Sequence, residues 1–294
     1  MLAPAAPTPA PARGPSLSPS RAGDFMACPL LYRFRVVDRL PQAPSPAAVR
    51  GSVVHAVLER LFELPAAKRT LAAAQNLIGP EWDRMRQAPE LAAAVGEDVA
   101  GTGWLAGAQE LLARWFAMED PTRLEPGARE LYVETVLDGG LLLRGYVDRL
   151  DVAADGRLRV VDYKTGRAPS PLFEAKALFQ MRFYALVLWR LRGRVPALLR
   201  LVYLGSGEMI SYAPDEADLL ATERKITALW AAIERAARTG DWRPSPGRIC
   251  GWCDHAALCP TRGGTPPPLP EDAVERVLGD PAALPEAPGL DEDG

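Results

Sequence analysis

The 294-residue sequence contains few of the residues that most often carry chemistry, with two histidines and four cysteines. It has no Walker A motif, GxxxxGK[ST], and therefore no recognisable ATP motor of its own. Its longest apolar helical run, YALVLW, is too short to cross a bilayer, and no targeting segment with an apolar core is present. No internal repeat occurs at the periods of solenoid proteins. We therefore expect a cytoplasmic protein without a membrane-bound part.

The charge of the chain is close to neutral but unevenly distributed. The sequence has 34 basic and 37 acidic residues, a formal net charge of −3. Acidic residues accumulate in residues 265–294, where the only basic residue is Arg276. The acidic residues there are Glu271, Asp272, Glu275, Asp280, Glu286, Asp291, Glu292 and Asp293. The remaining chain is mildly basic, which suits a phosphate-bearing partner but fits an ordinary solvated surface equally well.

Hydrophobic periodicity predicts an α/β domain with a mixed sheet flanked by helices. Apolar spacings of three and four predict helices over residues 16–40, 50–64, most of 67–119, 172–193 and 215–240. Alternation predicts strands over residues 130–137, 141–152, 158–163, 198–204 and 208–212. The Pro/Ala-rich residues 1–15 and the Pro/acid-rich residues 263–294 are expected to be disordered. One domain over 16–262 then remains, with a helical insertion at about 65–120.

The segment VVDYKTG, Val160–Gly166, places an acid and a lysine at the end of an apolar strand. Because side chains alternate along a strand, Asp162 and Lys164 emerge together on one face. A three-residue loop, Ala154–Gly156 with glycine in the left-handed conformation, suits the hairpin to the preceding strand GYVDRLDV. Counting back from that loop puts Asp148 opposite Asp162, with Cβ atoms roughly 5 Å apart. A two-residue loop would shift this pairing by one position.

Two carboxylates held that close repel each other unless a cation lies between them. Oxygen ligands favour Mg²⁺ or Mn²⁺. Lys164 beside such an ion could stabilise charge that develops on a phosphoryl group, or orient an attacking water. The alternative is an ordinary Asp–Lys ladder on the surface of a sheet. The pattern therefore predicts either a divalent-metal site or a solvated ion pair.

Four further polar residues are candidates for the same site. His55 lies in the middle of the predicted helix RGSVVHAVLER, and Glu134 is an acid inside the apolar strand LYVETVL. Gln180 and Tyr184 are four residues apart and so share one helix face. His55 and the Gln180/Tyr184 pair have ordinary alternatives, since a lone helical histidine is often structural or solvated and a Gln/Tyr pair can be a polar helix edge.

The segments GSVVHAVLE, GYVDRLDV…LRVVDYKTG and QMRFYALVL resemble, in this order, four motifs of RecB-type nucleases in the PD-(D/E)XK superfamily. The motifs are His, Asp, Asp-x-Lys and Gln-x-x-x-Tyr, and the resemblance covers about residues 16–260. It implies a restriction-endonuclease-like core that hydrolyses DNA with Mg²⁺ or Mn²⁺. The roles implied are metal ligands for His55, Asp148, Asp162 and the carbonyl of Tyr163, a catalytic lysine for Lys164, and active-site or DNA-contacting residues for Glu134, Gln180 and Tyr184.

The resemblance also implies a substrate and partners. Single-stranded DNA or DNA ends are the expected substrates, cut by an exonuclease-like enzyme in repair or recombination. The basic residues near the N-terminus that could guide the DNA backbone are Arg21, Arg33, Arg35 and Arg39. Two alternatives stay open. One is a catalytically silent DNA-end-binding or scaffold subunit, and the other is a nuclease that works only within a helicase–nuclease or CRISPR adaptation complex.

The four cysteines are expected to bind metal, because disulfides are rare in the cytoplasm. They are Cys28, Cys250, Cys253 and Cys259. Zinc sites more often comprise two local cysteine pairs. A lone N-terminal cysteine with a C-terminal C-x2-C-x5-C triplet instead resembles the iron–sulfur clasp of the AddB subunit and of RecB-like CRISPR-associated nucleases. The resemblance implies a [4Fe–4S] cluster that joins the N- and C-terminal parts; zinc, with His255 as a competing ligand, is the alternative.

Overall fold

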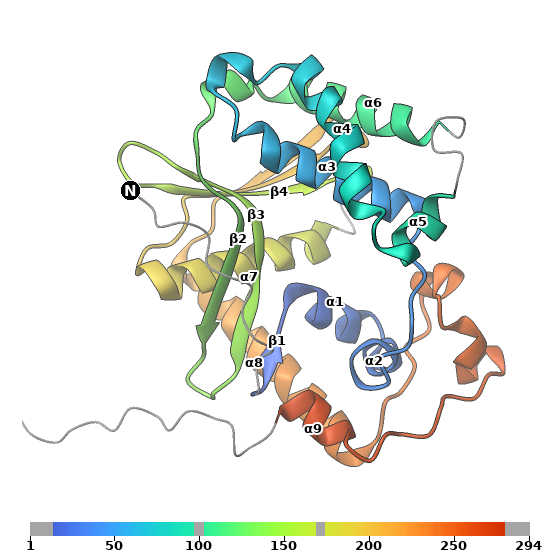
Figure 1. Cartoon of the computed structure of the whole chain (residues 1–294). Coiled ribbons are helices and arrows are strands. Elements are labelled where there is room, and N and C mark those ends of the chain that lie inside the picture. The colour runs from blue at the N-terminus through green and yellow to red at the C-terminus, as the bar shows by residue number, and fades with distance from the viewer. Residues whose placement is uncertain (1–13, 97–102, 169–173, 280–294) are drawn as a thin grey trace, which may run out of the picture. The chain divides into compact units, whose positions relative to one another are not determined.

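The computed structural model of the chain (Figure 1) describes residues 14–96, 103–168 and 174–279. The chain divides into two compact units. Of the described residues, 42–96, 103–133, 145–168 and 174–223 belong to the first unit, and 14–41, 134–144 and 224–279 belong to the second. Among the described residues, no helix has both the length and the apolar character needed to cross a membrane.

Two helices of the first unit, Pro46–Leu61 and Leu71–Met85, begin at a side-chain cap, Ser45 and Thr70 respectively. The helices of this unit are α3 (Pro46–Leu61), α4 (Leu71–Met85), α5 (Pro89–Val95), α6 (Trp104–Met118) and α7 (Glu174–Arg192). Helix α3 starts four residues before the predicted position 50, because Ser45 accepts a hydrogen bond from the amide of Ala48 and Pro46 occupies the first turn. The helices predicted over most of 67–119 are present as α4, α5 and α6.

The sheet is mixed, as predicted. Its strands are β1 (Ser16–Leu17), β2 (Pro126–Val136), β3 (Leu142–Val152), β4 (Leu158–Lys164), β5 (Leu198–Tyr203) and β6 (Glu208–Tyr212). The order is β1-β3-β4-β5-β6, and β2 also pairs with β3. Strands β4 and β5 are parallel and are connected through α7, whereas β3–β4 and β5–β6 are antiparallel. The short strand β1, which periodicity did not indicate, pairs with Leu142 and Leu143.

The hairpin between β3 and β4 has the predicted register. Arg149 pairs with Val161, and the amide of Ala153 donates to the carbonyl of Arg157 at 2.9 Å. Gly156 closes the loop with a φ of 80°, the left-handed conformation that favours glycine. This hairpin brings Asp148 next to the end of β4.

Both faces of the central strands are covered. In the first unit, α3, α4 and α6 lie over one face of the strands and α7 lies against the other (Figure 1). Val161, Tyr163 and Val202 belong to the core formed with α3, α4 and α6, while Val160 and Leu201 are buried in the strands. Burial on both faces explains why these parallel strands are almost continuously apolar, and makes Asp162 and Lys164 conspicuous at the end of β4.

The ends of β4 and β5 approach so closely that only glycine fits. A Cβ at Gly205 would lie 2.5 Å from the carbonyl carbon and oxygen of Gly166, and the amide of Gly205 donates to that oxygen at 3.0 Å. We expect Gly205→Ala to lower the free energy of unfolding by about 1–3 kcal/mol through this overlap. Urea unfolding measures it, with exposed Gly139→Ala, whose Cβ would meet no atom within 4 Å, as the control. Equal stability of the two variants would contradict the overlap.

The N-terminal helix predicted over 16–40 is broken in the second unit. It comprises α1 (Pro19–Ala27), α2 (Pro29–Tyr32) and a π-helical turn, Arg33–Val37. Cys28 separates α1 from α2 in an extended conformation because Pro29 disfavours the helical conformation of the residue before it. Ser18 caps α1, accepting from the amide of Arg21 at 3.3 Å.

The C-terminal part of the second unit is more ordered than the composition suggested. Helix α8 (Glu216–Thr239) leads into 3-10 turns around the C-terminal cysteines, and α9 (Ala273–Leu278) follows. Helix α9 lies within residues 263–294, for which disorder was expected. Its apolar residues Ala273 and Val277 are buried, and Arg276 donates to the carbonyl of Val37 at 2.7 Å. Residues 1–13 and 280–294, where disorder was also expected, lie outside the described residues.

Candidate active site and metal centre

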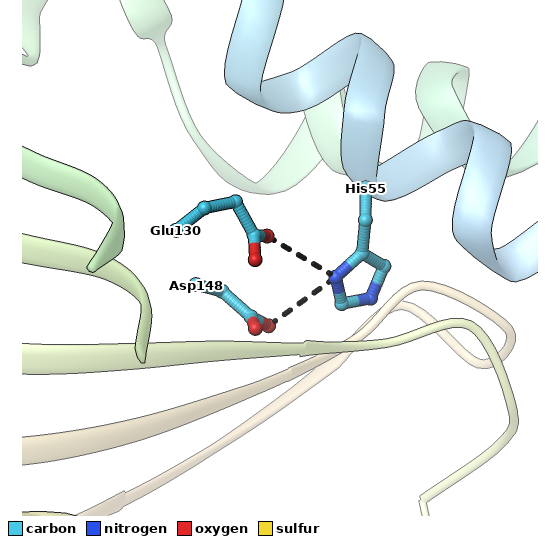
Figure 2. A group of neighbouring side chains, drawn as sticks. All are labelled: His55, Glu130 and Asp148. Atoms are coloured by element: carbon cyan, nitrogen blue, oxygen red, sulfur yellow. Dashed lines mark ion pairs between the residues drawn. The ribbon is translucent and has the colours of Figure 1, made fainter. Parts of the chain in front are cut away.

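Three side chains from different elements converge in the first unit. His55 comes from α3, Glu130 from β2 and Asp148 from β3, and their side chains point toward one another (Figure 2). Nδ1 of His55 lies 3.5 Å from Oδ2 of Asp148 and 3.9 Å from Oε1 of Glu130. One ligand atom from each residue lies within 4.8 Å of the others. One nitrogen and two carboxylate oxygens fit a divalent cation.

Glu130 is the member of this group that the sequence did not indicate. Its backbone has a φ of 40°, a conformation that residues other than glycine rarely adopt. Such strain gathers where the surrounding structure re-aims a side chain at a functional site. Glu134, the predicted acid, is exposed four residues further along β2 in the second unit and is not part of the group. The DGG turn after β2 was the signal in the sequence that could have indicated Glu130. Counting back along both strands from that turn places Glu130 opposite Asp148.

The environment of the group disfavours negative charge. Burial raises the pKa of Asp148 to about 7, and the nearby carboxylate of Asp162 adds to this, while His55 acts in the opposite direction. Burial opposes the charge on His55, but Glu130 and Asp148 outweigh it and raise the pKa of the imidazole. The carboxylates repel each other and favour the protonated form of the nearby histidine. A divalent cation bound between them would remove this repulsion.

A second set of side chains surrounds Asp162 at the end of β4. Nζ of Lys164 lies 2.7 Å from Oδ2 of Asp162 and donates to Oε1 of Gln180 at 3.0 Å. Nε2 of Gln180 in turn donates to Oδ1 of Asp162 at 3.0 Å. The three side chains thus form a closed ring. The predicted common face of Asp162 and Lys164 is confirmed, and Asp162 contacts Lys164 and Gln180 while lying within electrostatic reach of His55 and Asp148.

Helix α7 brings the predicted pair Gln180 and Tyr184 to the same place. Tyr184 is buried, and burial raises the pKa of its hydroxyl to about 12. Its bond with Gln180 opposes that shift, and the carboxylates of Asp162 and Asp148 add to it. Tyr184 therefore lies within the electrostatic reach of both acids as a neutral phenol.

Tyr163 touches both His55 and Asp148. Its amide donates to Oδ2 of Asp148 at 2.7 Å, where a continued ladder would offer it the carbonyl of Val147. Its ring meets the His55 ring edge-on, with centroids 6.0 Å apart. Its hydroxyl accepts from Nη1 of Arg149 at 2.6 Å. Tyr163 thus connects two members of the metal group to the buried residues beneath them.

Those buried residues form an ion network. Arg149, only 1% exposed, donates from both terminal nitrogens to Glu119, at 2.8 Å each. Its Nε lies 3.1 Å from Asp151, and Trp115 donates to Glu119 at 3.0 Å. The bidentate geometry and the extra hydrogen bonds compensate for taking these charges out of water.

A cleft of about 770 Å³ opens beside the metal group. One face of α3 lines it with Ala48, Ser52, His55 and Glu59. The opposite wall includes Glu130 and the end of β4, Lys164–Gly166. The cleft therefore brings a candidate metal group and a lysine to one solvent-accessible site.

Metal binding is expected to stabilise the protein through this group. We expect Mn²⁺ at about 100 times its dissociation constant to raise the free energy of unfolding by about 2.7 kcal/mol. Asp148→Asn keeps an acceptor for the Tyr163 amide but removes the repelling charge. In the absence of metal, this variant should therefore have a higher melting temperature than the wild type. Mn²⁺ should not raise its melting temperature further. Thermal melts with and without Mn²⁺ measure both effects.

The control is Asp155→Asn in the exposed hairpin loop, which should leave the Mn²⁺ response intact. A full Mn²⁺ response in Asp148→Asn would show that the ion binds elsewhere.

In the second unit, the four cysteines line one pocket of about 30 Å³, and all are free thiols. The structure thus places Cys28 in the same pocket as the C-terminal triplet. The amide of Ser245 donates to Sγ of Cys28 and that of Gly247 to Sγ of Cys250, each at 3.4 Å. Two of the four sulfurs therefore accept hydrogen bonds from backbone amides, and in the described residues the cysteines are not among the groups whose ligand atoms all lie within 4.8 Å of one another.

His255 and the N-terminal arginines are largely occupied within the second unit. His255 is buried with its ring 5.3 Å from that of Phe34, and burial lowers the pKa of its imidazole. Arg33 is bound to Asp38 and to the carbonyl of Pro267. Arg35 is bound to Asp24 at 2.6 Å. Burial lowers the pKa of Arg21. Two of the four arginines expected to guide DNA therefore hold the fold together.

The fold and the site together define a nuclease class in which acidic residues and a lysine meet at the end of a central strand. Residues 16–260 match the family model of the PD-(D/E)XK nuclease superfamily, and the chain belongs to this superfamily. It is therefore a nuclease, and its superfamily uses divalent metals.

Curated relatives come from mycobacteriophages. The Gene 69 protein of Mycobacterium phage D29 is 28% identical over 274 residues, which cover 84% of this chain and 97% of the relative. The Gene 69 protein of Mycobacterium phage L5 is 34% identical over 137 residues, 45% of this chain and 44% of the relative. A crystal structure from Eubacterium rectale, named "Putative exonuclease", has a TM-score of 0.53 and 16% identity, and covers 82% of this chain and 87% of that one. At this identity the crystal structure supports the fold alone.

Proposed function

We propose that the protein is a RecB-type, Mg²⁺- or Mn²⁺-dependent DNA exonuclease that cuts single-stranded DNA or DNA ends in repair or recombination. The convergence of His55, Glu130 and Asp148, two of which line one open cleft together with Lys164, carries the proposal. A binding protein has no need to hold repelling carboxylates next to a lysine, because such a group disfavours a phosphate backbone until a cation is bound.

The residues divide into those that hold a cation and those that act on the substrate. His55, Glu130 and Asp148 would hold the cation, with Asp162 and the carbonyl of Tyr163 as further ligands. A bound cation supplies Lewis-acid polarisation of the scissile phosphate and a water of lowered pKa. Lys164 stabilises negative charge that develops on the phosphate oxygens. Gln180 keeps the lysine in place by accepting its hydrogen bond.

Cleavage of end-labelled DNA tests the proposal. Single-stranded and duplex oligonucleotides, each blocked at the 5′ or the 3′ end, are incubated with Mg²⁺, Mn²⁺ or a chelator. We expect metal-dependent loss of nucleotides from an unblocked end, faster on single strands. Tight DNA binding without cleavage in either metal would contradict the enzyme and favour the silent end-binding or scaffold subunit. Cleavage that needs an added helicase would favour a nuclease that works only within a larger complex.

For the second unit we propose a [4Fe–4S] cluster held by Cys28, Cys250, Cys253 and Cys259. Support comes from their common pocket and from the amides that donate to two of the sulfurs. Such a cluster would tie residue 28 to the C-terminal triplet and close a very long loop, so its loss would loosen the unit. Zinc in the same pocket is the competing occupant.

Colour and metal content distinguish these occupants. Protein purified without oxygen is expected to be brown, with absorption at about 400 nm from thiolate-bound iron. Cys253→Ser should lose the colour and melt at a lower temperature. Trp252→Ala, the neighbouring residue that is 71% exposed, should keep both. Colourless wild-type protein with one zinc per chain would contradict the cluster.

A further inference from the structure

An aromatic pair lies on the β2–β3 ribbon of the first unit and has no part in the mechanism above. The rings of Tyr132 and Tyr146 are 5.2 Å apart and inclined at 58°. Tyr146 is 44% exposed and, with Trp252, is one of two aromatic residues among the exposed large hydrophobic side chains of residues 14–96, 103–168 and 174–279. A ring that is supported on one side and open to solvent on the other can accept a flat partner.

The register of the ribbon places this pair next to the metal group. The amide of Leu137 donates to the carbonyl of Leu141 at 3.0 Å and closes the hairpin. Counting back along the antiparallel strands, Tyr132 falls opposite Tyr146, as their ring contact requires, and Glu130 falls opposite Asp148. Tyr132 and Tyr146 form a non-hydrogen-bonded pair, in which side chains lie closest. The aromatic pair is therefore the next pair on the same face, about 7 Å along the strands from the carboxylate pair.

This neighbourhood matches the two parts of a single-stranded nucleic acid. Proteins bind such strands by contacting phosphates and by stacking bases on aromatic side chains. The cation proposed at Glu130 and Asp148 would take the scissile phosphate. We infer that Tyr146, supported by Tyr132, stacks on the unpaired base of a nucleotide next to that phosphate. The inference rests on the proposed nuclease function and names its substrate as DNA whose bases are free of a duplex.

The alternative role of the pair is to stabilise the hairpin. Cross-strand aromatic pairs do contribute to stability, but that contribution comes from the contact between the two rings. It gives no reason for one of them to keep nearly half of its surface in water. A base on Tyr146 would cover this surface, and a base inside a duplex, already stacked on its neighbours, could not.

The first test is the affinity for a short, dye-labelled oligothymidine, measured by anisotropy in Ca²⁺ buffer in which the wild type is first shown to leave the probe uncut. We expect Tyr146→Ala to weaken binding about 5- to 150-fold, the effect of losing one base–aromatic stack, and Tyr146→Phe to bind like the wild type. The control is Val152→Ala, a residue on the same strand that is 43% exposed. It should not change the affinity, and neither should Tyr146→Ala change the affinity for a blunt duplex.

The second test reads the stack directly. In Tyr146→Trp, oligothymidine should quench the fluorescence of the new indole beyond any change in the wild type. A series of oligonucleotides, each with one abasic nucleotide at a different position, gives an independent check. At one position the wild type and Tyr146→Ala should bind equally, because the base that stacks on Tyr146 is then missing. Thermal melts of every variant separate a loss of binding from a loss of folding.

The outcomes distinguish the two proposals. Wild-type protein that neither binds nor cuts DNA would overturn the proposed function. Wild-type protein that cuts DNA, with Tyr146→Ala binding as well as Val152→Ala, would overturn the stacking role alone. An equal loss of affinity for single-stranded and duplex DNA in Tyr146→Ala would also overturn the stacking role, because it would indicate a contact that does not require an unpaired base.

Discussion

Lys164→Ala is expected to lower the single-turnover rate of DNA cleavage by about 100- to 1,000-fold, the usual effect of removing one group that stabilises transition-state charge. The structure gives the reason. Of the lysines and arginines in the described residues, Lys164 is the one that lines the cleft. Its ammonium is held 2.7 Å from Asp162 and 3.0 Å from Gln180, so it is oriented before the substrate arrives.

The control for this variant is Lys68→Ala, because Lys68 is exposed in the 3-10 turn Ala66–Lys68. It removes the same charge from the protein and should cut DNA at the wild-type rate. Mn²⁺ binding measured by calorimetry shows whether Lys164→Ala still holds metal at His55, Glu130 and Asp148. Cleavage at the wild-type rate by a folded, metal-binding Lys164→Ala would rule out this lysine as the catalytic residue.

Arg149→Met is expected to cost about 3–5 kcal/mol of the free energy of unfolding, because it leaves a buried carboxylate without its partner. Glu119 would lose both bonds from the guanidinium, and the hydroxyl of Tyr163 would lose its donor. Arg159→Met is the matched control. Arg159 is half-buried and pairs with Asp151 at 2.8 Å, so its removal should cost less than about 1 kcal/mol. Urea unfolding measures both.

The double variant Glu119→Gln, Arg149→Met shows whether the unpaired charge is the cause. It removes the stranded carboxylate and should therefore recover part of the loss. A double variant less stable than Arg149→Met alone would mean that the loss comes from packing around the guanidinium, which also lies over the rings of Phe62 and Tyr163.

The same network predicts a dependence on pH. Burial opposes the charged form of Glu119, but the bonds from Arg149 outweigh it and lower the pKa of the carboxyl below its usual 4.5. Its stabilising contribution is therefore present above the unfolded pKa and is lost as the pH falls through the lowered one. Without Arg149, burial would raise that pKa, and stability would decrease as the pH rises. The difference between wild type and Arg149→Met should thus be larger at pH 8 than at pH 5.

This network also supports the site. Arg149 follows Asp148 in β3 and holds the hydroxyl of Tyr163. The amide of Tyr163 in turn holds Asp148, and its ring meets His55. A folded Arg149 variant is therefore expected to bind Mn²⁺ more weakly, even though the arginine cannot itself be a ligand.

The sequence by itself determined the parts of the site that depend on local geometry. Alternation along β4 was sufficient to put Asp162 and Lys164 on one face, and helical spacing was sufficient to pair Gln180 with Tyr184. The glycine of the β3–β4 loop set the register that brings Asp148 beside them. These relations hold between residues a few positions apart or across a tight turn, where backbone geometry leaves few choices.

Only the tertiary structure decided which distant residues complete the two sites. Glu130 rather than Glu134 meets His55 because α3 packs against the β2–β3 ribbon at Glu130 and Asp148. Cys28 lines one pocket with the C-terminal cysteines, which the resemblance implied but which spacing along the chain cannot show. Arg149 is a charged residue that is buried among Glu119, Tyr163 and Asp151, which all contact its guanidinium. Each outcome depends on contacts between segments far apart in the chain, which periodicity and spacing do not encode.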